Sequence, residues 1–543
     1  MSTADPSQFS DDQEPEDDQD LEDQEDGEQA DERRQSVGWV GWLISGGVHA
    51  ALILIMAAIV VGAQIIQQDP PAVRVAVIET PPKKEEKPKD RALQETVEVN
   101  IVSETETPNP VTALEMPVEK LESEDESDAK DAKGREEAVA NSEMGGQGAF
   151  MAIGAGGGSS GMFGKRTGGG RKRAVGLYGG SKGSESAVEA GLRWLKRHQS
   201  PNGVWDPVGY PGNCEDNPKC EPGKDVSGAK NAMTGYAVLC FLGAGYDHKT
   251  PNKYRDTVKR GVEYLVASQA ADGGFGRNYE NGICTMALAE AFAMTGDPDL
   301  KDPAQRGMDK ICATQANDPK GKDPAYDKLG WDYGAPNPGR NDSSVSGWNV
   351  MALKSGLAAG LDVKGGIDGS KHWLEVVWKA TNPGWETLDV YKGESKFPYT
   401  YDGNAGTAGG HTNLACVGMV ACVFLGHHSG DVMLETLANF VMSKQTPAAW
   451  ANVNLYYTYY NTLGVFQVGG EKWKTWNGVV RDLFVNNQRK GEGCFDGSWN
   501  WDDSGKFHGI EIGRIISTVY SILSLEVYYR YDQVAGKPAK KGP

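Results

Sequence analysis

Aromatic and polar side chains stand at the starts of several Ala-rich and Leu-rich segments in the second half of the chain. Tyr and Trp rings stack on apolar or sugar-ring surfaces, and Asn, His, Glu and Arg side chains exchange hydrogen bonds with hydroxyl or charged groups. Such groups suit a site for an isoprenoid, a lipid or a glycan, but they equally suit helix caps that satisfy buried amides. The candidate binding residues are Tyr279, Asn281, Asp342, Trp348, His411, Asn413, Tyr456, Tyr459, Glu511 and Arg514.

Two adjacent carboxylates form the candidate catalytic pair. Asp502 and Asp503 end the string Asn500-Trp501-Asp502-Asp503, which follows a Gly-Ser-Trp turn. A carboxylic acid protonates a substrate when neighbouring carboxylates and a dry pocket raise its pKa. An exposed loop is the alternative location for a string in this position.

Cys214 and Cys220 bracket a short loop rich in Asn, Asp and Pro. A disulfide between them would close a small ring, which persists only in an oxidising compartment. A zinc site would need two further ligands, and none stands nearby in the sequence. The pattern therefore predicts a disulfide, with no metal and no other cofactor.

The elements that position these residues follow from a repeated pattern. GLRWLKRHQSPNGVW begins at Gly191, and GVEYLVASQAADGGF begins at Gly261 with the same internal spacing. In each copy, apolar residues at helical spacing precede a Gln and a Gly-x-aromatic turn, and a segment rich in Ala, Leu, Val and Met follows. We interpret the unit as two antiparallel helices, with the Gln amide bonded to carbonyls of the helix end and of the next loop.

Weaker copies of the repeat complete the set of helix pairs. Gln315 to Trp331 and Gln488 to Trp499 are two of them, and two further helix pairs lie between, which gives six pairs over residues 185–534. The sequence therefore predicts an all-α fold, an (α/α)6 toroid of six helix-hairpin repeats, in which the inner helices line a central cavity.

The Gln-x3-Gly-x-Trp spacing resembles the repeat of squalene and oxidosqualene cyclases and of the β subunits of protein prenyltransferases. The resemblance covers about two thirds of the chain, and it implies the fold more than the chemistry. The D-x-D-D acid motif of the cyclases has Asn500 at its first position here, and those enzymes use two toroid domains where this chain has room for one.

The zinc ligands of the prenyltransferases are also incomplete in this sequence. Those enzymes hold zinc with a D-x-C pair and a distant His. No D-x-C occurs here, Asp309 and Cys312 are one residue too far apart, and His411 and Cys416 fall on different faces of one helix. Because these zinc ligands are incomplete, the sequence predicts no metal site in this ring.

The chain before the ring divides by composition. Residues 1–36 are an acidic tail that carries most of the net charge of −20, residues 37–66 an apolar transmembrane helix, and residues 67–184 a linker rich first in Pro, Glu and Lys and then in Gly; residues 535–543 form a short tail. The acidic tail and the linker are expected to be disordered. The overall acidity argues against nucleic acid as a partner.

The apolar segment carries a resemblance of its own. Ser45 and His49 repeat the Ser-x3-His spacing of energy-transducing TonB proteins, and PPKKEEKPKD resembles their periplasmic spacer. The resemblance implies a single pass through the inner membrane, a cytoplasmic N-terminus, a periplasmic toroid and docking on a proton-driven ExbB/ExbD-like complex. An inert anchor, in which His49 pairs with Ser45, is the alternative.

Two functions follow. The first is a membrane-anchored, non-enzymatic toroid that binds a ligand or a protein partner in the periplasm. The second is a terpenoid cyclase- or prenyltransferase-like enzyme that acts on an isoprenoid, with Asp502 or Asp503 as the proton donor. The missing motifs favour the first function, and the fold resemblance supports the second. A toroidal polysaccharide lyase or hydrolase is a third alternative, for which the sequence offers no dedicated carboxylate pair.

Overall fold

The computed structural model describes residues 166, 168–322, 327–402, 413–507 and 509–531. All of them belong to the compact unit Met116–Pro543. The acidic tail, the predicted span at residues 37–66 and the C-terminal tail lie outside the described residues. Among the helices that are described, none is both long and apolar enough to cross a membrane.

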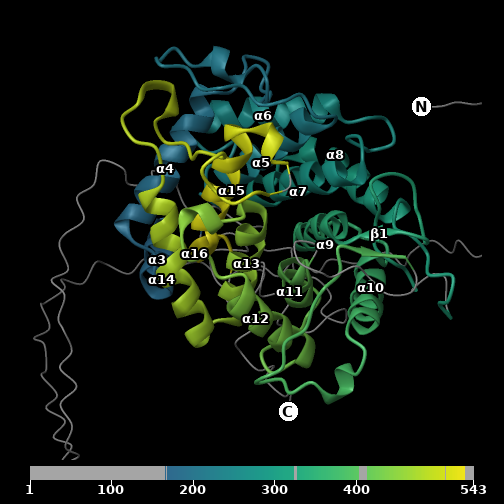
Figure 1. The fold of residues 1–543 in the computed structure, drawn as a ribbon. Coiled ribbons are helices and arrows are strands. Elements are labelled where there is room, and N and C mark those ends of the chain that lie inside the picture. Colours follow the sequence, from purple (N-terminus) through teal and green to yellow (C-terminus); the bar gives the residue numbers. More distant parts are fainter. Residues whose placement is uncertain (1–165, 167, 323–326, 403–412, 508, 532–543) are drawn as a thin grey trace, which may run out of the picture. The chain divides into compact units, whose positions relative to one another are not determined.

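Six inner helices form a closed ring (Figure 1). Each of them contacts the next, and the last contacts the first. The prediction of an (α/α)6 toroid is confirmed by this order. The inner helices are α5 (Ala229–Gly243), α7 (Asn278–Thr295), α9 (Ser343–Ala358), α11 (Ala415–Phe424), α13 (Leu455–Val468) and α15 (Arg514–Leu525).

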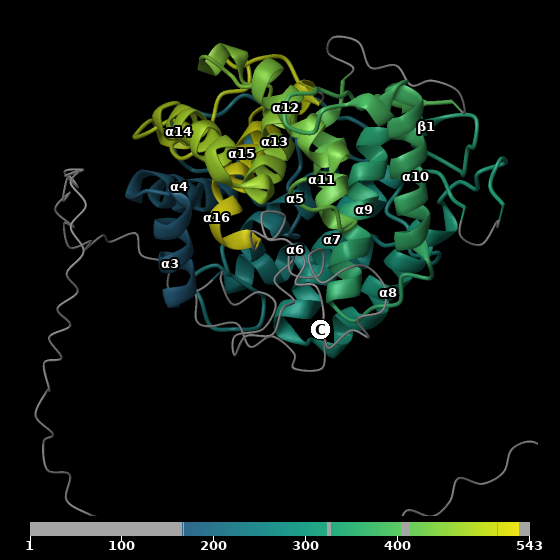
Figure 2. The same ribbon diagram turned by 90° about the horizontal axis from the view of Figure 1, so that it is seen from below.

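Six outer helices surround this ring, and each contacts two neighbouring inner helices (Figure 2). An outer helix such as α4 buries one face, with Ala187, Val188 and Leu192 among its buried residues, whereas almost every residue of α7 is buried. Apolar periodicity therefore marks the outer helices, and continuous apolar composition marks the inner ones. The outer helices are α4 (Lys182–Arg197), α6 (Arg255–Ser268), α8 (Pro298–Ala313), α10 (Gly366–Thr381), α12 (Val432–Lys444) and α14 (Gly470–Asn486).

The remaining elements are short. Strands β1 (Asn341–Asp342) and β2 (Thr400–Tyr401) pair antiparallel, with Asn341 opposite Tyr401. Single-turn 3-10 helices interrupt the loops, and α16 (Val527–Arg530) follows α15. The 3-10 helices are η2 (Tyr210–Asn213), η3 (Trp385–Thr387), η5 (Trp450–Asn452), η6 (Gly493–Phe495) and η7 (Ile510–Ile512).

The linker predicted for residues 67–184 is too long at its C-terminal end. Residues 168–178 form helix α3 (Gly168–Tyr178), which packs on α16. Arg171, part of a basic cluster in that predicted linker, is buried: it donates to the Glu185 carboxylate at 2.6 Å and to the Ala244 carbonyl at 2.9 Å. The Gly-rich composition concealed a helix that is held by tertiary contacts rather than by helix propensity.

The shared spacing of the repeat copies has a direct structural meaning, because Gln199, Gln269 and Gln488 each join one outer helix to the next. The side-chain amide donates to the Gly carbonyl of its own turn and to a carbonyl of the following outer helix. These pairs are Gly203 and Thr257 for Gln199, Gly273 and Pro303 for Gln269, and Gly497 and Ala187 for Gln488. The predicted bonds therefore reach the neighbouring outer helix, and the last copy reaches the first one.

The Gly and the aromatic residue complete this contact, which we call the Gln-Gly-Trp contact. A Cβ at Gly203 would lie 2.1 Å from the Arg260 carbonyl oxygen, so that only glycine permits the approach. The Trp205 indole N–H donates to the Leu195 carbonyl at 2.8 Å, which packs the ring over the end of its own helix. Trp331 and Trp499 make the same bond in their copies.

Replacement of the ring-closing glutamine should destabilise the fold. Gln488→Ala leaves the buried carbonyls of Gly497 and Ala187 without their donor, and we expect a loss of about 1–3 kcal/mol in the free energy of unfolding, measured with denaturant. Gln315→Ala is the matched control, because the Gln315 amide is buried at the equivalent position without a hydrogen-bond partner among the described residues. Equal losses in the two variants would contradict a role of the bonds.

Candidate functional site

The centre of the ring is filled by aromatic side chains. Trp348 stacks on Tyr459 at 5.8 Å and meets Tyr236 edge-on at 5.0 Å, and Tyr456 packs against Tyr460 at 5.1 Å. None of these side chains, nor that of Tyr520, is more than 2% exposed. Three residues predicted to line a cavity, Trp348, Tyr456 and Tyr459, therefore meet on the axis, but as part of a packed core.

A buried ion-pair cluster lies on the same axis at the end where the inner helices finish. Glu290 of α7 accepts from Arg166 at 2.8 Å and from Arg530 at 3.2 Å, and Arg166 also donates to the Leu242 carbonyl in α5. Burial by itself raises the pKa of Glu290, but the two guanidinium groups outweigh burial and hold this pKa below its usual range. One signal of this cluster is visible in the sequence: Glu290 is the single carboxylate within the apolar part of α7 that follows its first turn.

The opposite end of the axis, where the inner helices begin, carries three half-buried tyrosines around a buried carboxylate. We call Tyr279, Tyr333, Tyr399, Asp342 and Arg340 the tyrosine mouth. The rings of Tyr279 and Tyr333 are stacked at 6.2 Å, and the Arg340 guanidinium lies 5.8 Å from the Tyr333 ring and 3.4 Å from the Asp342 carboxylate. Of the candidate binding residues, Tyr279 and Asp342 are brought together here.

Electrostatics keep the hydroxyl groups of the mouth protonated. Burial, and next the negative charge of Asp342, raise the pKa of Tyr399 and of Tyr333. One oxygen of Asp342 accepts the backbone N–H groups of Ser344 and Val345 and so caps α9. The mouth therefore offers neutral hydroxyl groups, one carboxylate and one guanidinium, which also pairs with Asp332.

The other candidate binding residues have structural partners. Asn281 accepts the Phe275 N–H at 2.6 Å, and Asn413 accepts the Ala415 N–H at 3.0 Å at the start of α11. Arg514 is buried and forms two bonds to Glu221, at 2.8 and 3.0 Å, whereas Glu511 is exposed. Helix capping and burial account for Asn281, Asn413 and Arg514 but not for Glu511; His411 lies outside the described residues.

The candidate proton donors lie in an exposed loop. Asp503 accepts from the Trp450 indole at 2.7 Å and from the Asn500 amide at 2.9 Å, and Asp502 is exposed. Neither carboxylate faces the axis of aromatic side chains. Asp502 and Asp503 therefore lie in an exposed loop, which was the alternative location for this string.

The predicted disulfide between Cys214 and Cys220 is not formed. All eight cysteines have free thiols, and those of Cys214 and Cys220 are buried. Both side chains turn towards His198 and Cys494, which are distant in the sequence. Spacing within the loop favoured a local pair, but the fold brings in partners from the first and last repeats.

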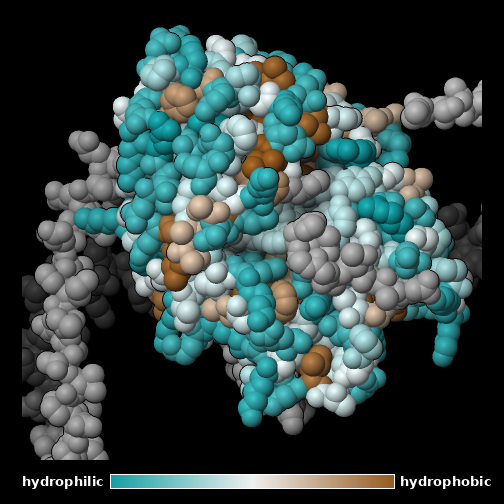
Figure 3. Space-filling model, in the orientation of Figure 1, coloured by the Kyte–Doolittle hydropathy of each residue, from teal (hydrophilic) through white to brown (hydrophobic). Residues whose placement is uncertain are grey.

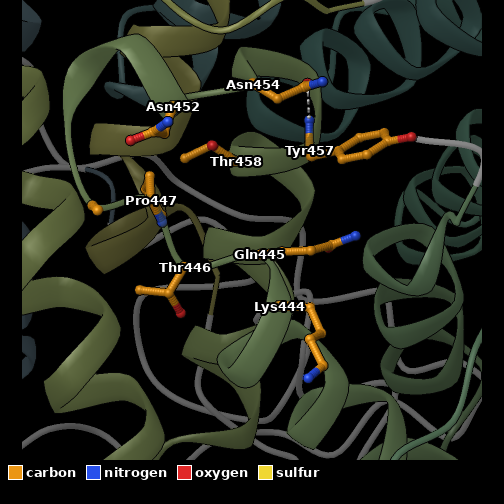
Figure 4. A pocket seen from close by; sticks show the side chains of 9 residues that line it. Lys444, Gln445, Thr446, Pro447, Asn452, Asn454, Tyr457 and Thr458 are labelled. Carbon is orange, nitrogen blue, oxygen red and sulfur yellow. Dashed lines mark hydrogen bonds between the residues drawn. The ribbon is translucent and has the colours of Figure 1, made fainter. Parts of the chain in front are cut away.

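A polar hollow of about 480 Å³ lies beside α13, at the end of the ring that carries the tyrosine mouth (Figure 4). Asn454 caps α13 by accepting the Tyr457 N–H at 3.0 Å, and its amide donates to the Lys506 carbonyl. The hollow thus has amide, hydroxyl and ammonium groups around one tyrosine. Its lining residues are Lys444, Gln445, Thr446, Pro447, Ala448, Asn452, Asn454, Tyr457 and Thr458.

A second hollow, of about 570 Å³, lies outside the ring between α10 and the loop that joins α11 to α12. Trp378 and Trp385 line it together with His427, whose ring nitrogen lies 2.9 Å from Asp431. On the face shown in Figure 3, hydrophilic residues predominate and hydrophobic ones are scattered.

Comparison with known proteins gives structural likenesses alone. No family model matches the sequence, and no curated protein matches it. An inactive variant of the α-1,6-mannanase of Salegentibacter sp. HEL1_6, in complex with α-1,6-mannotetrose, shares 12% identity over 64% of this chain and 99% of its own, with a TM-score of 0.44. Unsaturated glucuronyl hydrolase from Bacillus sp. GL1 shares 13% identity over 63% of this chain and 96% of its own, with a TM-score of 0.42.

The type II terpene cyclase MstE from Scytonema shares 12% identity over 64% of this chain and 97% of its own, with a TM-score of 0.37. TM-scores below 0.5 carry no weight for the chemistry of this chain. The toroid is established by its own helix contacts.

Replacement of Glu290, the buried carboxylate on the ring axis, should destabilise the fold. Glu290→Gln leaves Arg166 buried without its counter-charge and leaves Arg530 with only the more distant Glu526 at 3.6 Å, and we expect a loss of about 3–5 kcal/mol in the free energy of unfolding at neutral pH. Glu263→Gln removes an exposed pair with Lys259 and should cost at most about 1 kcal/mol.

The difference in stability between wild type and Glu290→Gln should become smaller at acidic pH. Because the pKa of Glu290 is lowered on folding, its contribution is complete above the unfolded carboxyl pKa of about 4.3 and is lost as the pH falls through the folded value. Denaturant unfolding at a series of pH values should therefore show wild type and Glu290→Gln converging in acid. A gap that stays constant with pH would rule out the ion pair as its cause.

Proposed function

We propose that the ring is a binding module whose ligand is a glycan, and that the tyrosine mouth is its binding surface. The observation that carries this proposal is the position of Tyr279, Tyr333 and Tyr399 around Asp342, at the end of the axis where the inner helices begin. Below this point, Trp348 and its aromatic neighbours close the axis. A ligand that approaches along the axis would therefore meet the mouth and go no deeper.

The chemistry of the mouth fits a sugar better than an isoprenoid. Half-buried tyrosine rings offer flat faces for pyranose C–H groups, and their hydroxyls, Asp342 and Arg340 offer donors and acceptors in fixed positions. An isoprenoid chain needs a deep apolar cavity, which the buried aromatic core of the axis does not provide. The polar hollow beside α13 would extend the surface for further sugar units.

Binding is also better supported than catalysis. The acids nominated for proton transfer, Asp502 and Asp503, lie in an exposed loop. Within the mouth, Asp342 is engaged in capping α9 and lies beside Arg340. These contacts give Asp342 a structural role at the start of α9.

Removal of one ring from the mouth should weaken glycan binding. We expect Tyr333→Ala to lower affinity by roughly tenfold, which corresponds to about 1.4 kcal/mol, because the variant loses a stacking face and a hydroxyl. A glycan array with the full chain would identify the sugar, and calorimetry would measure the affinity. Tyr391→Ala, at a tyrosine that is 83% exposed, is the control and should bind normally.

Two results would contradict this proposal. One is a folded chain that binds squalene or polyprenyl diphosphates but no oligosaccharide. The other is turnover of an isoprenoid that is lost in Asp502→Asn, which would establish the cyclase-like alternative.

We further propose that residues 37–66 anchor the ring in the inner membrane, with a cytoplasmic N-terminus and a periplasmic ring. The uncharged stretch supports this, as does the Ser45 and His49 spacing. The free thiols of Cys214 and Cys220 remove a disulfide as support for an oxidising compartment, so the orientation rests on the TonB-like resemblance.

The anchor histidine offers a test of coupling. If His49 faces an ExbB/ExbD-like complex, His49→Ala should abolish a site-specific crosslink to that complex in cells, because an intramembrane imidazole is retained for such a contact. Leu52→Ala, in the same segment, should leave the crosslink intact. A crosslink that persists without His49 would support an inert anchor.

A further inference from the structure

Four side chains with metal-ligating atoms converge where the first repeat meets the last. His198 directly follows α4, Cys214 and Cys220 lie in the loop after η2, and Cys494 lies in η6. The imidazole and the three thiols are all buried. The fold therefore gathers three sulfurs and one nitrogen from three separate segments into one dry site.

Three of the four ligand atoms form one compact group, and the Cys220 sulfur lies beside the imidazole. His198 Nε2 lies 3.0 Å from Cys494 Sγ and 3.8 Å from Cys220 Sγ. The ligand atoms of His198, Cys214 and Cys494 all lie within 4.8 Å of one another. Zn–N bonds of about 2.0–2.1 Å and Zn–S bonds of about 2.3 Å place tetrahedral ligands about 3.6–3.8 Å apart, so small shifts of the side chains would admit the ion.

The imidazole is oriented as a ligand. Its Nδ1 lies 2.7 Å from the Trp194 carbonyl oxygen, and because a carbonyl can only accept, Nδ1 carries the proton. Nε2 then presents its lone pair to the sulfurs, and a backbone carbonyl on the other ring nitrogen is the usual outer partner of a metal-bound histidine. The ring is held by stacking on Trp194 at 4.0 Å and by the edge of Tyr210 at 5.5 Å.

The backbone around the cysteines is held by its own contacts. The Cys494 N–H donates to the Pro218 carbonyl at 3.2 Å, and the Cys494 carbonyl accepts the Trp194 indole N–H at 2.8 Å. A Cβ at Gly493 would lie 2.1 Å from the Asn217 carbonyl oxygen, so glycine is needed where η6 meets the loop. These contacts bring the two cysteine-bearing segments together before any ion binds.

We propose that His198, Cys214, Cys220 and Cys494 bind one Zn²⁺ ion as a structural site that closes the ring. Three thiolates and one imidazole in tetrahedral arrangement are a zinc donor set. Four buried protein ligands leave no open position for a substrate or a reactive water, which distinguishes this site from a catalytic one. The ion would join the end of the first outer helix to the loop that follows the last.

The site also positions a residue of the inner ring. Glu221 directly follows Cys220, and its carboxylate forms the two bonds to Arg514 at the start of α15. An ion held by Cys220 would therefore fix this loop against α15 as well as against α4. This role is independent of what the tyrosine mouth binds.

Metal content tests the proposal directly. The full chain, purified in detergent under reducing conditions, should contain about one zinc per chain by plasma mass spectrometry, and Co²⁺ in its place should give thiolate charge-transfer bands with tetrahedral d–d bands. Cys494→Ala should lose the zinc and the bands. Cys312→Ser is the matched control, because Cys312 donates to the Val363 carbonyl away from the site and should leave both unchanged.

The wild-type measurement decides the question even if Cys494→Ala fails to fold. A folded wild-type chain that contains no zinc and gives no cobalt bands would overturn the proposal. A disulfide among Cys214, Cys220 and Cys494 in wild type, found by peptide mass mapping, would also overturn it. If the site is structural, removal of zinc by phenanthroline should lower the midpoint of thermal unfolding and expose residues 206–223 to protease.

Discussion

Closure of the ring is the constraint on which the rest of the structure depends. An open array of helix pairs would leave the apolar faces of its first and last units in water, whereas a closed ring buries both. The bond from Gln488 to the Ala187 carbonyl repeats between the last and first outer helices the contact that Gln199 and Gln269 make between successive ones. A local motif of the sequence therefore acts as a long-range connector.

Closure also determines where a ligand can bind. Six inner helices in mutual contact bring Trp348, Tyr459 and Tyr236 together, and these rings fill the axis that sequence reasoning expected to be open. At the far end Arg166 pairs with Glu290, which leaves the starts of the inner helices as the accessible end of the axis. The function of the ring is therefore sought at the tyrosine mouth rather than inside it.

The fold was predictable because its signal is local, and much of the candidate site was not because its signal is distant. The Gln, Gly and Trp of each copy lie within a few residues, so one pattern reveals helix, turn and partner. Cys214 and Cys220 were visible as a pair, but Cys494 follows Cys220 by 274 residues. His198 directly precedes the repeat glutamine Gln199, and the repeat pattern assigns it no role. Tyr333 and Tyr399 lie in irregular loops whose path no periodicity describes.

The zinc site lies at a contact with fewer hydrogen bonds than those of Gln199 and Gln269. At those two contacts an arginine of the next outer helix also donates to the side-chain oxygen of the Gln, Arg260 to Gln199 and Arg306 to Gln269, each at 2.8 Å. In α4 the position equivalent to these arginines is Ala190. A Cβ at Gly497 would meet the Ala190 carbonyl, just as Cβ atoms at Gly203 and Gly273 would meet the carbonyls of Arg260 and Arg306. The methyl side chain of Ala190 cannot donate a hydrogen bond to the Gln488 side-chain oxygen. The contact that completes the ring thus lacks one hydrogen bond that the contacts of Gln199 and Gln269 have, and the cysteine-histidine cluster lies beside it, where a metal ion would compensate for the loss.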